Sequence, residues 1–315
     1  MSKVTKVGNF MATTITNSQV GMVLRPEVIK EFTTLLPHLI TWLTRRKKEI
    51  LFLEAERERL KKILPEKHFK AVTFAEIPQF LKTDGPLLSL GGDGTLIGLC
   101  RKVKGISPPI FGVNLGRLGF ITEFSRHSLY EDLEIYFKGG LLLESFHPFL
   151  AVIESQGKTP LEIPFINDAV ISKNSISRMF TLGIELDDGP VVVISGDGVI
   201  FSTPIGSTAY SLAAGGPIVH PGVPSLVVTP ICPHGPAPRP MVLPENLSVK
   251  TQLGKGEDHV LLTIDGQEAI SITHKDTVSI RKDTSRTIRM IKNPARTYFD
   301  TLRDKLLFEA KGRIF

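Results

Sequence analysis

Apolar positions near the start of the chain predict a strand followed by helices. The run VGMVL (residues 20–24) is typical of a buried strand. From Pro26 to Leu43, apolar residues recur every three or four positions, which predicts a helix that Pro37 should kink or split. Residues 49–63 predict a second helical stretch.

Two strand–loop–helix units follow. Residues 87–90 (LLSL) predict a strand, which leads through the glycine-rich turn GGDGT into a helix, LIGLCRKV. Residues 109–113 predict the next strand, followed by the loop NLGRLGF and a helix near residues 128–137. Because strands alternate with helices, we expect a parallel, doubly wound, Rossmann-like sheet up to about residue 125.

The pattern changes after residue 140 to short β-branched runs separated by Gly, Pro and Asp-Gly turns. These runs are residues 149–153, 169–172, 191–194, 226–229, 261–264 and 277–280. They predict a mostly-β sandwich, and the later segment FDTLRDKLLFEA predicts a helix. We expect a flexible tail at residues 1–18, an α/β domain at 19–125, the sandwich domain at 126–288, and a segment at 289–315 that returns to the α/β domain.

Composition narrows the choice of partners. Lys and Arg total 38 against 32 Asp and Glu, a net charge of +6 that suits an anionic ligand. The one dense basic run (residues 45–48) closes a predicted helix, and with a single Trp and four Tyr the chain is not expected to bind nucleic acid. No apolar run approaches the roughly 18 residues of a membrane span. Two cysteines and a polar N-terminus predict a cytoplasmic location.

The strongest local signal for chemistry is the turn GGDGT between a strand and a helix. Its glycines let the backbone approach an anion, and the helix N-terminus offers free N–H groups to phosphate. Asp93 would repel phosphate, so it would bind a metal or take a proton from an attacking hydroxyl. A tight Asp-Gly turn is the structural alternative.

A second glycine-rich block, GDGVIFSTPIGSTAYSLAAGGP, covers residues 196–217. Ser207 is predicted to cap a short helix that Gly215 and Gly216 end, and Tyr210 could offer its ring to a base. Asn167 and Asp168 could together grip ribose hydroxyls, although this dipeptide is more often a turn.

Three further features carry less chemistry. Asp265-Gly266 is read as a hairpin turn, with Gln267 just beyond it. Cys232 and His234 lack a second pair of ligands, so no zinc site is expected. The chain has no Walker A, G-x-G-x-x-G or G-x-S-x-G motif, which argues against a P-loop ATPase, an ordinary Rossmann dehydrogenase and an α/β-hydrolase.

Taken in order, GGDGT, NLGRLGF, the Asn-Asp pair, the long STPIGSTAY block and TIDGQ resemble the NAD kinase family. The resemblance implies transfer of the γ-phosphoryl group of ATP to the 2′-hydroxyl of the adenosine ribose of NAD, with Mg²⁺ or another divalent cation accompanying ATP. It also implies an α/β domain, a β-sandwich domain, and assembly as a homodimer or homotetramer. The partners are then the small molecules NAD and ATP.

Carried onto the matching positions, the resemblance makes Asp93 the general base, with Gly91, Gly92, Gly94 and Thr95 facing phosphates. The other residues that it places around the dinucleotide, some from a neighbouring subunit, are Arg117, Phe120, Asn167, Asp168, Arg178, Asp197, Thr208, Ala209, Tyr210, Ser211, Leu212, Ala213 and Gln267. Among these, Asn167 and Asp168 would hold a ribose or nicotinamide end, and Tyr210 would stack on adenine.

The chain departs from the family pattern at three positions. Asp168 stands where Glu is common, Ile205 where Thr or Ser is common, and Ser195 where many bacterial members carry Arg. Two alternatives follow from the residues. A lipid kinase of the diacylglycerol or sphingosine class shares GGDGT, and a non-catalytic dinucleotide sensor would explain Ile205 and Ser195.

Overall fold

The computed structural model describes residues 18–27, 30–116, 119–174, 180–187, 189, 192–234, 239–256 and 260–306. The chain divides into two compact units. Unit 1 consists of residues 1–96, 108–144 and 289–315, and unit 2 consists of residues 97–107 and 145–288. Within the described ranges, no helix is both long enough and apolar enough to cross a membrane.

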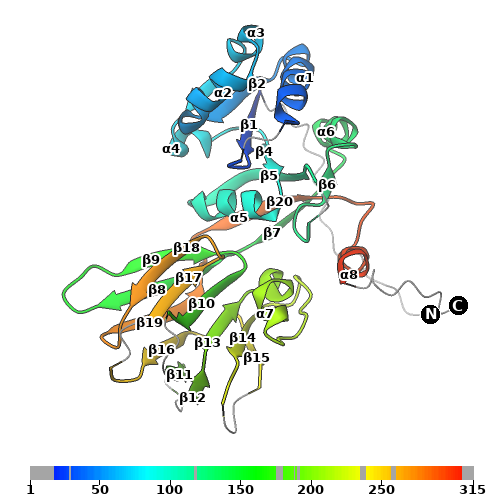
Figure 1. Cartoon of the computed structure of the whole chain (residues 1–315). Coiled ribbons are helices and arrows are strands. Elements are labelled where there is room, and N and C mark those ends of the chain that lie inside the picture. The colour runs from blue at the N-terminus through cyan, green and yellow to red at the C-terminus, as the bar shows by residue number, and fades with distance from the viewer. Residues whose placement is uncertain are drawn as a thin grey trace, which may run out of the picture. The chain divides into compact units, whose positions relative to one another are not determined.

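An eight-stranded sheet forms the centre of unit 1 (Figure 1). Its strands are β1 (Gln19–Leu24), β2 (Glu49–Leu53), β3 (Thr73–Ala75), β4 (Leu87–Gly91), β5 (Ile106–Asn114), β6 (Phe124–Ser125), β7 (Leu142–Phe146) and β20 (Thr287–Lys292). The order is β3-β2-β1-β4-β5-β20-β7, with β6 also paired to β5. The strands from β1 to β6 pair in parallel. Near the C-terminus the chain returns as β20, beside β5.

Helices cover both faces of this sheet. They are α1 (Phe32–Arg45), η1 (Glu54–Glu56), α2 (Arg57–Ile63), α3 (Glu66–Phe69), α4 (Ile77–Phe80), α5 (Asp93–Lys102) and α6 (Leu129–Phe137), and a further helix, α8 (Tyr298–Leu306), follows β20 in the chain. Leu88 and Leu90 of β4 share one apolar core with α1 and α6. Leu87 points to the opposite face, where Phe80 of α4 packs, and Leu96 of α5 lies over Gly112. The prediction of a doubly wound α/β sheet is therefore confirmed.

One predicted helix was wrong in its first third. Residues 49–53 form strand β2, and only the residues after it become helical, as η1 and α2. Ile50, Leu51 and Phe52 are all buried, because β2 is paired in parallel with β1 and with β3. A short apolar run reads as either element from sequence, and burial on both faces of the sheet decides for a strand here. The preceding helix α1 is not split at Pro37, since apolar residues on both sides of it pack into the core.

Unit 2 is a sandwich of two six-stranded antiparallel sheets, ordered β15-β14-β13-β10-β17-β18 and β12-β11-β16-β19-β8-β9. The strands are β8 (Phe149–Ser155), β9 (Leu161–Phe165), β10 (Asp168–Lys173), β11 (Phe180–Leu186), β12 (Val192–Gly196), β13 (Gly198–Ser202), β14 (Ser225–Ile231), β15 (Met241–Pro244), β16 (Val249–Leu253), β17 (Val260–Ile264), β18 (Glu268–Ile272) and β19 (Asp276–Lys282). One core cluster joins Phe201 and Leu262 of the first sheet to Phe165 and Ile280 of the second. The predicted β-sandwich is thus confirmed. Its short helices are η2 (Ile205–Thr208) and α7 (Tyr210–Ala213).

Candidate active site

In unit 1, the carboxylate of Asp93 is held by a loop that follows β5. Asp93 is the first residue of α5, and its Oδ2 accepts a hydrogen bond from the backbone N–H of Phe120 at 2.7 Å. Its Oδ1 accepts from the N–H groups of Ile121 at 3.3 Å and Thr122 at 3.0 Å, and from the Thr122 hydroxyl at 2.8 Å. We call Asp93 with these donors the Asp93 seat.

The loop motif NLGRLGF is built to make this seat. A Cβ at Gly119 would collide with the Asp93 carboxylate, so only glycine lets the loop close around it. Asn114 braces the loop from two sides: its amide donates to the Thr122 hydroxyl at 3.0 Å, and its Oδ1 accepts from Gly116 N–H at 2.8 Å. Arg117 lies outside the described residues.

The glycine-rich turn supplies a short strand-to-helix connection. Gly91 closes β4, and the carbonyl of Gly92 accepts hydrogen bonds from Thr95 N–H at 3.1 Å and Leu96 N–H at 3.3 Å. Gly94 is exposed in the first turn of α5. The exposed glycine and the helix start leave backbone that a phosphate could approach closely, and the predicted phosphate contact stays a prediction.

In unit 2, a second carboxylate is held in the same way. Asp265 lies in the turn between β17 and β18, and its Oδ1 accepts from the N–H groups of Asn167 at 2.7 Å and of Ile166 and Asp168 at 3.1 Å each. Its Oδ2 also accepts from Ile166 N–H at 3.1 Å. In return, the N–H of Asp265 donates to the carbonyl of Asp168 at 2.9 Å. We call this group the Asp265 seat.

The Asp265 seat brings two acidic side chains into a region of low polarity. Asp168 is 5% exposed, and burial together with the nearby Asp265 raises its pKa to about 7. Burial also raises the pKa of Asp265. The backbone hydrogen bonds that Asp265 accepts and the charge of Arg101 lower this pKa, but by less, and Arg101 Nε lies 3.8 Å from Asp265 Oδ2. The same burial and the charge of Asp265 raise the pKa of the Cys100 thiol to about 12, so this thiol stays protonated.

The STPIGSTAY block packs directly on Asn167. The carbonyl of Asn167 accepts from Thr203 N–H at 2.9 Å, and a Cβ at Gly206 would collide with that same carbonyl. The Thr203 hydroxyl donates to the Ile166 carbonyl at 2.6 Å. The structure therefore brings the Asn-Asp pair and the start of the second glycine-rich block together, although the two motifs lie about 35 positions apart in the sequence.

The predicted helix cap at Ser207 was wrong. Ser207 lies inside η2, and its buried hydroxyl donates to the Pro204 carbonyl at 2.7 Å. Helix α7 begins after Ala209, which makes no side-chain cap. The hydroxyl is drawn inward because it also accepts from Val219 N–H at 3.1 Å and so ties the following loop to η2.

The remaining residues of this block differ in what they expose. The ring of Tyr210 is 47% exposed, Ala213 is exposed, and Thr208, Ala209 and Leu212 are half-buried. Ser211 is fully buried, with its hydroxyl 2.9 Å from that of Thr229. Tyr210 can therefore offer a face to a ligand, whereas Ser211 serves packing in this structure.

Asp197 is not brought to the Asn-Asp pair within one chain. It lies at the corner between β12 and β13 and pairs with Lys173 Nζ at 2.6 Å, a contact that lowers the pKa of its carboxyl. Asp168 pairs with Ser202, at the other end of β13. The length of β13, five residues, therefore separates Asp197 from Asp168 by roughly 16 Å. Gln267 ends the β17–β18 turn, and its side chain lies near Gly98. Arg178 lies outside the described residues.

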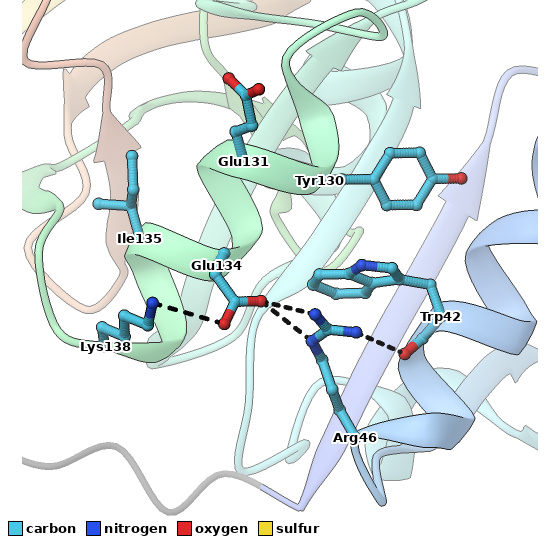
Figure 2. Close-up of a pocket in the computed structure, with 7 residues that line it drawn as sticks. All are labelled: Trp42, Arg46, Tyr130, Glu131, Glu134, Ile135 and Lys138. Carbon is cyan, nitrogen blue, oxygen red and sulfur yellow. Dashed lines mark hydrogen bonds and ion pairs between the residues drawn. The ribbon is translucent and has the colours of Figure 1, made fainter.

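A hollow of about 430 Å³ between α1 and α6 of unit 1 contains none of the predicted site residues. Figure 2 shows the Arg46 guanidinium between the Trp42 ring, 3.6 Å from its centroid, and the Glu134 carboxylate, which it donates to at 2.8 Å. Lys138 approaches the same carboxylate. These groups satisfy one another, so the hollow is a packing feature of the two helices.

Metal ligands are sparse in the described part of the chain. No group of three or more His, Cys, Asp or Glu side chains there could hold a metal ion. Cys100 is a free, buried thiol and Cys232 a free, exposed one.

Unit 1 is thus an α/β unit that holds Asp93 at a glycine-rich turn, and unit 2 is a β-sandwich that holds Asp168 beside Asp265. Residues 20–141 match the ATP-NAD kinase N-terminal domain, and residues 166–292 match the ATP-NAD kinase C-terminal domain. The chain belongs to the NAD kinase family.

Curated relatives agree with this assignment. The chain is 43% identical over 220 residues to the NAD kinase of Syntrophotalea carbinolica, covering 70% of this chain and 77% of that protein. It is 36% identical over 276 residues to the NAD kinase of Geobacter metallireducens, covering 85% and 91%. These relatives support NAD kinase activity, and they favour neither the lipid kinase nor the sensor alternative.

Two solved structures share the fold. Yeast NADH kinase complexed with NADH superposes with a TM-score of 0.82 at 22% identity, covering 95% of this chain and 90% of that one. An NAD kinase from Archaeoglobus fulgidus in complex with ATP gives a TM-score of 0.67 at 23% identity, covering 91% and 98%.

Sequence reasoning missed the residues that support the site. It read Asp265 as a turn residue, and it named neither Gly119 nor Thr122. The signal for Gly119 was present in the two glycines of NLGRLGF, since a loop glycine often marks a close approach. Nothing local pointed to Asp265, because its three donors come from residues about 100 positions earlier.

Proposed function

We propose that the enzyme transfers the γ-phosphoryl group of ATP to the 2′-hydroxyl of the adenosine ribose of NAD, with Asp93 as general base. The observation that carries this proposal is the Asp93 seat. Three of its four hydrogen bonds go to Oδ1 and one goes to Oδ2. A seated carboxylate is held in one orientation, and Oδ2, the less engaged oxygen, is the atom that would accept the proton of the attacking hydroxyl.

The substrate-binding roles extend this proposal. Asn167 and Asp168 would hold a ribose by donating and accepting hydrogen bonds, and exposed Tyr210 would stack on adenine. The turn Gly91–Gly92 and the start of α5 would face phosphates. The roles of Arg117 and Arg178, which lie outside the described residues, stay predictions.

We further propose that a divalent cation such as Mg²⁺ arrives with ATP. Mg²⁺ is commonly held by one or two carboxylates together with substrate phosphates, so a chain without a three-ligand cluster in its described residues fits a metal carried by the triphosphate. When bound, the cation supplies charge neutralisation on the phosphates. The chain's own contribution is alignment of the hydroxyl and acceptance of its proton.

The test is Asp93→Asn. Asparagine keeps one oxygen for the N–H groups of Ile121 and Thr122, but the NH2 group that replaces Oδ2 cannot accept a proton, so kcat should fall by about 10²–10⁴-fold, with a much smaller change in NAD affinity. NADP formation is measured through an NADP-specific dehydrogenase, and NAD affinity by calorimetry. Turnover at the wild-type rate would remove Asp93 from the base role.

Assembly as a homodimer or homotetramer is also proposed. The position of Asp197, at the far end of β13 from Asp168, supports a role for Asp197 in the site of a neighbouring subunit. Mixing inactive Asp93→Asn chains with inactive Asp197→Ala chains should then restore part of the activity, because one subunit would supply each intact residue. Absence of recovery in verified mixed oligomers would contradict shared sites.

A cytoplasmic location is proposed as well. The two free cysteines, one of them exposed, suit a reducing compartment. Fractionation of cells with an antibody to the chain tests it, and recovery in the membrane or secreted fraction would contradict it.

A further inference from the structure

We propose that Asp265 is a positioning residue for dinucleotide binding, which fixes the backbone of Ile166, Asn167 and Asp168 so that the side chains of the last two start from fixed positions. This inference rests on the proposed role of Asn167 and Asp168 in holding a ribose. It assigns to Asp265 a function beyond the hairpin turn in which it lies.

The turn itself does not require a carboxylate. Asp265 and Gly266 have φ angles of 50° and 63°, and Gln267 N–H donates to the Ile264 carbonyl at 2.9 Å. Asn-Gly adopts a hairpin turn with two positive φ angles as readily as Asp-Gly does. The negative charge must therefore be explained by something other than the turn.

The hydrogen bonds of the Asp265 seat supply that explanation. Three successive N–H groups converge on one carboxylate, whose side chain is completely buried. Such a concave set of N–H groups suits an anion, and it restricts the backbone angles of the residues that donate. The return bond from Asp265 N–H to the Asp168 carbonyl closes the arrangement. Asn167 and Asp168 therefore begin from a fixed backbone.

Arg101 of α5 contacts the Asp265 seat and the strands β9 and β18. Its Nε donates to the Pro164 carbonyl at 3.2 Å and lies 3.8 Å from Asp265 Oδ2, and its Nη2 pairs with Glu268 of β18. Its side chain is 14% exposed, so this cation is shielded from water. In the described part of the chain, the charged and titratable groups around Asp265 include Asp168, Arg101, Glu268 and Cys100.

The seat also sets the charge of Asp168. Asp168 must be ionised to accept hydrogen bonds from ribose hydroxyls with both oxygens. The charge of Asp265 contributes to the raised pKa of Asp168, so NAD binding should weaken as the pH falls through about 7. Removing the charge of Asp265 should move this weakening to lower pH.

The experiment compares Asp265→Asn with Asp276→Asn. Asp276 is a matched control: its carboxylate also holds a turn, accepting from Thr273 N–H at 2.8 Å and from the Thr273 hydroxyl at 2.9 Å, but at the start of β19 in the other sheet. In Asp265→Asn, the amide group replaces one acceptor with a donor, and so loosens the Ile166–Asp168 backbone. We expect the KM for NAD to rise roughly fivefold or more, with kcat and the KM for ATP within about twofold of wild type.

The pH profile separates positioning from structural support. The pH at which the KM for NAD begins to rise should move down in Asp265→Asn and stay in place in Asp276→Asn. If Asp265→Asn lowers the melting temperature but leaves the KM for NAD and its pH profile unchanged, Asp265 only stabilises the β17–β18 hairpin and the proposal is overturned.

Two further measurements keep the outcome decisive. Amide hydrogen exchange on the unaltered enzyme should show Ile166, Asn167 and Asp168 protected to the level of the sandwich core, and exchange at the rate of loop amides would overturn the proposal even if Asp265→Asn does not fold. Asn167→Ala tests the proposed function separately. If that variant binds NAD normally, the ribose role of the pair fails, whatever Asp265 does.

Discussion

The two units hold an aspartate by the same device but to different ends. Asp93 accepts three successive backbone N–H groups from residues 120–122, and Asp265 accepts three from residues 166–168. Asp93 begins a helix and is half-buried, whereas the Asp265 side chain is completely buried beside a second carboxyl. The same hydrogen-bond pattern therefore orients the proposed reactive group in one unit and the proposed binding backbone in the other.

The difference lies in which partner faces the ligand. In the Asp93 seat, the loop fixes the carboxylate, and the carboxylate is the group proposed to react. In the Asp265 seat, the carboxylate fixes the loop, and the loop carries the groups proposed to bind. A carboxylate surrounded by N–H groups thus supports a catalytic role only where it is also accessible, and Asp93 is half-buried whereas the Asp265 side chain is completely buried.

Among changes that leave both carboxylates in place, the largest effect is expected from breaking the Asp93 seat with Gly119→Ala. The new Cβ would collide with the carboxylate, and a displacement of about 1 Å in a catalytic group can cost about 10²-fold in kcat. Steady-state kinetics measure this loss. Gly116→Ala is the matched control in the same loop, because its Cβ would approach nothing closer than Asn114 Oδ1 at 3.7 Å. Equal activity of the two variants would contradict the importance of the seat.

A smaller effect should come from Asp168→Asn, and it should appear in how the stability of the folded protein depends on pH. The pKa of Asp168 is raised from 3.8 to about 7, first by burial, so the folded state binds this proton more tightly than the unfolded state. Its contribution to the free energy of unfolding is fully present below about pH 4 and is lost as the pH rises through about 7. At about 1.4 kcal/mol per pKa unit, the contribution is at most about 4 kcal/mol.

Asp168→Asn lacks this titration. Relative to wild type, its melting temperature should therefore rise between pH 5 and pH 8, whereas Asp276→Asn should show no such gain. Thermal unfolding in matched buffers measures the difference. A parallel pH dependence in wild type and Asp168→Asn would show that burial does not perturb this carboxyl.

The smallest effect is expected from Tyr210, which belongs to neither seat. Tyr210→Ala should raise the KM for NAD about tenfold, the scale of one base–aromatic stacking contact, while Tyr210→Phe should keep the wild-type KM. Because the ring is 47% exposed, neither change should alter the melting temperature. A KM unaffected by the loss of the ring would remove Tyr210 from adenine binding.

Prediction from sequence succeeded where the information was local. Strand and helix periodicities located the α/β sheet and the sandwich, and contiguous motifs identified the family. It failed where a short apolar run could be read either way, as at residues 49–53, and where a hydroxyl near a helix start looked like a cap, as at Ser207. In both cases, packing against a distant segment outweighed the local preference.

The sequence by itself determined which side chains are available and how each short segment prefers to fold, because these depend on neighbours within a few positions. Only the tertiary structure decided which backbone groups surround each carboxylate. The donors to Asp93 lie 27–29 positions away, and those to Asp265 lie 97–99 positions away, separations at which no spacing rule applies. Long-range pairing of strands brought Asp265 and Asp168 into contact, and burial raised the pKa of both carboxyls.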